Sequence, residues 1–210
     1  MSHAAFALEC AATFRYRNLP QYIATLDRPM NQLSAMNLLD PTITTDEETI
    51  DFAPRPADLR GLRIGLVENT KKNAEEVLRK LSEKLAAAYG MTAPVLVHKP
   101  QRAPVKEAQI AELKGHADFV IAGIGDCGAC SSGSLLDAII LEKAGIPAIA
   151  IVTDAFHATA REMAELWGVP DFRFVMMPHP LASLTAEEID RRADELLGKV
   201  TTLLREGQQA

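Results

Sequence analysis

From residue 63 to residue 206 the sequence alternates short, continuous apolar runs with longer segments of helical periodicity. The apolar runs do not alternate with polar residues, which is typical of strands covered on both faces of a parallel sheet. Since parallel strands need crossover helices, the pattern predicts an α/β fold. The predicted strands are 63–69, 93–99, 117–125, 146–153 and 172–178, and the predicted helices are 73–90, 105–115, 134–145, 158–168 and 185–206.

Right-handed crossovers would arrange these five strands as an open, doubly wound parallel sheet of the flavodoxin-like type, with the expected strand order 2-1-3-4-5. Ligands bind such sheets beyond the carboxyl ends of the strands, where the strand order reverses. This point lies between the first and third strands. Residues 68–73 and 125–134 are therefore the expected ligand-binding loops.

The pattern of the first 60 residues differs from that of the rest of the chain. We predict an N-terminal arm with short helices at 1–60 and an α/β domain at 61–210. Turn-forming sequences interrupt scattered apolar residues in this arm. Apolar side chains that do not form a core of their own need another surface to pack against. We therefore expect packing in a homo-oligomer, or on a protein partner through residues 1–37.

Composition argues against several kinds of partner. The net charge is −6 over 210 residues and no basic patch is present, so nucleic acid is not expected as a partner. No apolar run approaches the roughly 20 residues that a membrane-spanning helix requires, and no secretory signal is recognisable. Three cysteines are too few for a disulfide scaffold. We expect a cytoplasmic protein whose thiols stay reduced and whose substrate is a small molecule.

Two of the three cysteines, Cys127 and Cys130, lie in the sequence IGDCGACSSGS, directly before a predicted helix. Free backbone N–H groups and the positive end of the helix dipole stabilise a thiolate at such a position. The alternatives are that the two cysteines are small core residues or that they bind a metal. A zinc site, however, needs three or four protein ligands. The pattern favours a reactive thiol or a redox pair, and no metal ligand set is assigned.

Polar side chains from several predicted loops should gather around this pair. Asp126 and His179 are the candidate acid–base groups, and His179 stands between two prolines. Each candidate also has a purely structural alternative, such as a solvated turn or a helix cap. The expected substrate-binding residues are Asn69, Lys71, Ser131, Ser132, Asp154 and His157.

The cysteine segment resembles the UGSC family of proteins and selenoproteins, which carry selenocysteine or cysteine followed by Gly-Ser-Cys. The corresponding segment here is 126–130, and Ala129 replaces the usual serine. A selenol at the position of Cys127 would serve as a nucleophile or redox centre. The resemblance thus implies that Cys127 attacks and Cys130 resolves. Further segments similar to the family are 39–42, 59–78, 137–156 and 177–181.

Two more distant resemblances point to different chemistry. Residues 145–181 are similar in style to the substrate subunits of glycine reductase systems, which implies a thiol or selenol nucleophile and a small amino- or carboxylate-bearing substrate. The cysteine loop also resembles one half of an aspartate/glutamate racemase, in which cysteines move an α-proton. Racemases take one cysteine from each half, whereas both cysteines share one loop here.

The leading hypothesis is a cysteine-dependent enzyme that acts on a small anionic metabolite, with Cys127 as nucleophile and Cys130 as resolving thiol. No bound cofactor is expected, and an external thiol reductant would regenerate the thiols. One alternative is a cofactor-free isomerase, lyase or racemase with a cysteine as general base. Another alternative is a metal-holding or partner subunit of a larger complex.

Overall fold

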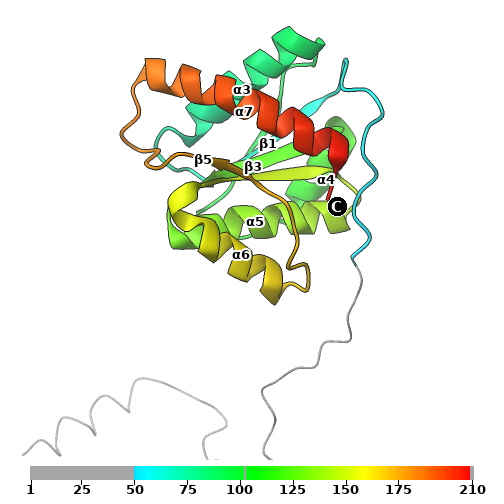
Figure 1. Ribbon diagram of the computed structural model, residues 1–210. Coiled ribbons are helices and arrows are strands. Elements are labelled where there is room, and N and C mark those ends of the chain that lie inside the picture. The colour runs from blue at the N-terminus through cyan, green and yellow to red at the C-terminus, as the bar shows by residue number, and fades with distance from the viewer. Residues whose placement is uncertain (1–49, 102, 209–210) are drawn as a thin grey trace, which may run out of the picture. The chain divides into compact units, whose positions relative to one another are not determined.

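The central sheet of the computed structural model, which describes residues 50–101 and 103–208, has five parallel strands in the order β2-β1-β3-β4-β5 (Figure 1). This is the flavodoxin-like, doubly wound order that the alternation of apolar and helical segments predicts, and the expectation is confirmed. The strands are β1 (Ile64–Glu68), β2 (Val95–His98), β3 (Phe119–Gly125), β4 (Ala148–Thr153) and β5 (Val175–Met177).

Helices cover both faces of the sheet (Figure 1). Apolar residues of α3 and α7 share one core with Phe119 and Ile121 of β3, whereas Val120 and Ala122 face the second core, under α4, α5 and α6. Because neighbouring residues of each central strand enter different cores, the strands are apolar throughout. The helices are α3 (Ala74–Tyr89), α4 (Glu107–His116), α5 (Gly128–Lys143), the short 3-10 helix η2 (Asp154–Phe156), α6 (His157–Leu166) and α7 (Ala186–Glu206).

The largest difference from the predicted boundaries is at α5, which begins at Gly128 instead of residue 134. Glycine and serine have low helix propensity, so the segment 128–134 reads as a loop in the sequence. Packing overrides this preference, because Ser131 is buried against the end of β3. The second cysteine and the three serines that follow it are therefore residues of a helix.

The stretch 50–60 packs onto the α/β unit. The Ala53 N–H group donates to Glu142 Oε2 at 2.9 Å, and Arg55 Nη1 lies 2.7 Å from Glu142 Oε1. The other features expected of the N-terminal arm, including its short helices and a partner surface at 1–37, lie outside the described residues. Within 50–101 and 103–208, no helix has the length and apolarity needed to cross a membrane.

The close approach of β3 and α5 gives a prediction about Gly125. A methyl group at this position would lie 2.7 Å from Ser131 Cα and 2.9 Å from Ser131 Oγ, which is too close for van der Waals contact. We expect Gly125→Ala to lower the free energy of unfolding by about 1–3 kcal/mol, as overpacking does. Urea unfolding monitored by circular dichroism measures this loss.

The matched control for Gly125 is Gly198 in α7, where an added methyl group meets no atom within 4 Å. Because alanine is the better helix former, Gly198→Ala is expected to raise the free energy of unfolding by about 0.5–1 kcal/mol. Equal unfolding midpoints for the two variants would show that the contact between β3 and α5 is not tight.

Candidate active site

The two cysteines lie at the junction between β3 and α5, where Cys127 is the N-cap residue of the helix. Its Sγ accepts a hydrogen bond from the Cys130 backbone N–H at 3.2 Å. Cys127 is half-buried and Cys130 is buried, and both are free thiols. One thiol thus remains within reach of a bound molecule, while the other lies directly behind it.

The surroundings shift the pKa values of the two thiols in opposite directions. Burial disfavours the Cys127 thiolate, but hydrogen bonds from the Cys130 thiol and backbone N–H, together with the Lys71 ammonium group, keep the pKa of Cys127 below its usual value. Burial raises the pKa of Cys130 to about 11, and the neighbouring Cys127 adds to this shift. As the pH rises, Cys127 therefore ionises first.

Lys71 reaches the thiol from the turn between β1 and α3. In this turn Thr70 and Asn73 have φ angles of 58° and 68°, a left-handed region that β-branched residues in particular avoid. The Asn73 side-chain amide donates to two carbonyl groups of the segment 181–184, at 3.0 and 3.1 Å. Strained residues of this kind concentrate at functional sites, because the surrounding structure must hold them in place.

His179 and Asp126 form a pair beside the thiols. His179 Nδ1 lies 2.9 Å from Asp126 Oδ1 and 3.3 Å from Thr153 Oγ1. The His179 backbone N–H donates to Asp154 Oδ1 at 3.0 Å, and Asp126 also accepts from the Leu181 N–H at 3.1 Å. Since these contacts occupy Nδ1, Nε2 of the half-exposed imidazole is the nitrogen that can exchange a proton with a bound molecule.

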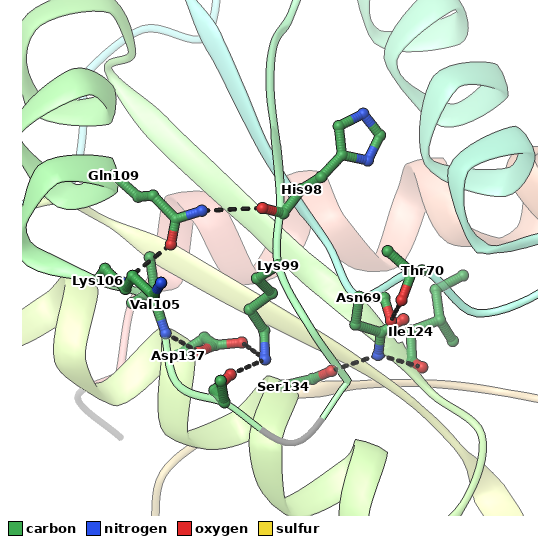
Figure 2. A network of polar contacts seen from close by, with 11 residues as sticks. Asn69, Thr70, His98, Lys99, Val105, Lys106, Gln109, Ile124, Ser134 and Asp137 are labelled. Atoms are coloured by element: carbon green, nitrogen blue, oxygen red, sulfur yellow. Dashed lines mark hydrogen bonds and ion pairs between the residues drawn. The ribbon is translucent and has the colours of Figure 1, made fainter.

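Asn69 is buried, with 1% of its surface exposed, and it joins three elements instead of facing solvent. Its Nδ2 donates to the Ile124 carbonyl at 3.0 Å and lies 3.4 Å from Ser134 Oγ (Figure 2). It therefore fastens the end of β1 to the end of β3 and to the second turn of α5. This position supports the turn that carries Lys71.

Three further candidate substrate-binding residues lie in α5 and α6. Ser131 is fully buried in α5, and its Oγ has no hydrogen-bond partner among the described residues. Ser132 is half-buried in the same helix. His157 is the first residue of α6, and its ring centroid lies 5.5 Å from that of Phe174. The structure thus brings Lys71 to the thiols, while a substrate-binding role for His157 stays a prediction.

A buried ion pair that involves α5, the helix that carries Cys130, was not predicted from the sequence. Lys99 Nζ lies 3.0 Å from Asp137 Oδ2 in α5 and donates to the Ala103 carbonyl at 2.7 Å, while Asp137 Oδ1 accepts from the Val105 N–H at 2.8 Å (Figure 2). Burial raises the pKa of Asp137, and Lys99 opposes that shift. The one signal in the sequence is an isolated carboxylate in the apolar stretch LLDAII.

A second polar cluster was also not predicted. Glu68, Glu75 and His98 each offer a potential ligand atom, and these atoms lie within 4.8 Å of one another. Glu68 and His98 are directly paired across β1 and β2. The shared position of both residues at strand ends is the signal that could have drawn attention to them.

The fold and the site together define a flavodoxin-like α/β protein with a thiol pair at the start of the helix that follows β3. The family model described as UGSC family matches residues 37–206, and the chain belongs to this family. No curated protein matches the chain. Among solved structures, a diflavin flavoprotein A3 from Nostoc sp. is similar to this chain, with a sequence identity of 15% and a TM-score of 0.34. The match covers 69% of this chain and 96% of the flavoprotein chain.

The likenesses to glycine reductase subunits and to aspartate/glutamate racemases stay predictions.

Proposed function

We propose that this protein is a cysteine-dependent enzyme in which the Cys127 thiolate attacks a small anionic substrate and Cys130 resolves the product of that attack. The observation that carries the proposal is the position of Cys127 at the start of α5, where its Sγ accepts a hydrogen bond from the Cys130 N–H group and lies next to Lys71. The pKa of Cys127 is lowered by Cys130 and Lys71 against the effect of burial, while that of Cys130 is raised to about 11. A lowered pKa is what a thiol nucleophile requires.

The proposed reaction is a two-electron reduction at the expense of the two thiols. The Cys127 thiolate donates its electron pair to an electrophilic substrate atom, and the leaving group departs with the electrons of its bond. Cys130 then loses its proton and attacks Cys127 Sγ. A disulfide forms, and the substrate fragment leaves with an electron pair and takes up a proton. A dithiol reductant returns two electrons and two protons to the cysteines.

His179 is the proposed source of the proton for the departing fragment. Asp126 holds Nδ1 of the ring at 2.9 Å, and Asp154 fixes the backbone of the same residue at 3.0 Å. An imidazole oriented in this way presents Nε2 for proton exchange with the departing fragment. The Asp126 carboxylate would also keep the ring in this orientation while it accepts the proton of Cys130.

The preference for an anionic substrate rests on the charges around Cys127. The Lys71 ammonium group lies next to the thiol, and the backbone N–H groups of the first turn of α5 point toward the same region. Helix N-termini attract negative charge, and a lysine strengthens this attraction. A substrate carboxylate bound here would place its neighbouring atoms beside the nucleophile.

The test is the pH dependence of alkylation by iodoacetamide, followed by mass spectrometry of the intact protein and its peptides. We expect Cys127 to react with a midpoint below that of free cysteine measured alongside, and Cys130 to stay unmodified until much higher pH. In Lys71→Gln the midpoint should move up and alkylation below it should slow several-fold, because a cation beside the thiolate is lost.

The matched control is Lys72→Gln, which removes the same charge from the exposed neighbouring residue and should leave the midpoint in place. An unreactive Cys127, or equal effects of the two lysine variants, would contradict the proposal. Deuterium incorporation from solvent into the product without any reductant would favour an isomerase, lyase or racemase instead. Modification that begins only after chelation would favour a metal-holding subunit.

A further inference from the structure

The cluster of Glu68, Glu75 and His98 lies on the face of the sheet that α3 covers. Glu68 and His98 end β1 and β2, and Leu66 and Leu96, two residues earlier in each strand, both contact the core on that face. The His98 ring points away from the buried Lys99–Asp137 pair (Figure 2). Glu75, in the first turn of α3, supplies the third side chain.

Glu68 is the unusual member of this cluster, because only 2% of its surface is exposed. Among the described residues its side chain forms one hydrogen bond, in which Oε2 lies 3.0 Å from His98 Nδ1. Its other carboxylate oxygen, Oε1, is buried and has no hydrogen-bond partner. A buried carboxylate oxygen without a partner is costly, and a cation that contacts both oxygens of Glu68 would remove that cost.

We propose that Glu68, Glu75 and His98 form a binding site for a divalent transition-metal ion, with zinc as the preferred metal. One imidazole nitrogen and two carboxylates are a donor set that zinc accepts, and three protein ligands leave a fourth position for water or another molecule. The ligand atoms come from a strand end, a neighbouring strand end and a helix start, which are all rigid elements of the fold.

The geometry requires one rearrangement. Two donor atoms of a tetrahedral zinc site are separated by about 3.3 Å, close to the 3.0 Å between Glu68 Oε2 and His98 Nδ1. The ligand atoms of the cluster are up to 4.8 Å apart, and Glu75 Oε1 is bound to Arg79 Nε at 2.6 Å. Glu75 therefore has to turn away from a solvent-exposed ion pair, which is weakly held.

The experiment is a titration of the full-length protein with Co²⁺, a spectroscopic substitute for Zn²⁺. We expect one equivalent to bind with visible d–d absorption and without the intense near-ultraviolet band of thiolate ligation, and Zn²⁺ to displace it. Glu68→Gln, Glu75→Gln and His98→Gln should each weaken binding by roughly tenfold or more, since even outer-shell substitutions cost that much.

The matched control is Glu76→Gln, which removes a carboxylate from the exposed residue next to Glu75 and should bind Co²⁺ like the unmodified chain. If Glu68→Gln fails to fold, the two variants at the more exposed residues Glu75 and His98 decide the question. A thiolate band, or binding that is unaffected by Glu75→Gln and His98→Gln, would overturn the proposal. None of these readouts depends on the proposed thiol chemistry, so the two can fail separately.

Discussion

Cys127→Ser is expected to abolish the rapid alkylation below the midpoint of the pH profile and, with a substrate in hand, to reduce turnover by at least about a thousandfold. A serine hydroxyl at the same position can still cap α5, because it also accepts the hydrogen bond that Cys130 N–H now donates to Sγ. It cannot ionise near neutral pH. The fold should therefore persist while the nucleophile is lost, as near-unchanged urea unfolding would confirm.

Cys130→Ser provides the contrast that separates the two roles. The variant should still alkylate at Cys127 and complete the first step with substrate, but it should form no intramolecular disulfide and should stop after a single turnover. Cys10→Ser should behave like the unmodified protein in both assays. Persistent rapid alkylation in Cys127→Ser, or full multiple turnover in Cys130→Ser, would rule out the assigned roles.

Lys99→Met is expected to lower the free energy of unfolding by about 3–5 kcal/mol, the cost of leaving one buried charge without its partner. Lys99 and Asp137 are 2% and 0% exposed, so water cannot take over the lost interaction. The remaining carboxylate keeps its hydrogen bond from Val105 N–H, but it loses the ammonium group at 3.0 Å. Chemical denaturation at neutral pH measures the loss.

Two further variants show that the effect belongs to the pair. Lys99→Met combined with Asp137→Leu removes both charges and should recover much of the stability, since apolar replacements of buried ion pairs are often tolerated. Lys84→Met breaks exposed contacts to Asp190 and Asp194 and should change the unfolding midpoint little. If Lys99→Met and Lys84→Met have the same effect, the buried pair does not stabilise the fold.

The periodicity of the sequence was sufficient to predict the five strands, their order and the edge of the sheet where the thiols lie. It was insufficient at α5, where Gly128 and the serines that follow look like a loop. The helix starts there because Cys127 caps it and because Gly125 lets Ser131 pack against the end of β3. The packing of Ser131 against β3 depends on the fold and not on local propensity.

The side-chain pairs of the site were harder to predict, because their members come from distant segments. Asp126 and His179 could each be named as acid–base candidates, but only the neighbouring positions of β3, β4 and β5 bring their side chains to 2.9 Å. Asn69 looked like a substrate ligand because it follows a strand. The structure turns it inward, where its amide holds the backbone of Ile124.

Glu142, near the end of α5, has a practical consequence for anyone who shortens this protein. Its buried carboxylate accepts the N–H groups of Ala53 and Ala148 and faces the Arg55 guanidinium group. A fragment that starts at residue 61 would lack two of these three partners and leave a buried charge uncompensated. Truncations for expression, crystallisation or fusion should therefore begin upstream of residue 50, even though β1 starts at Ile64.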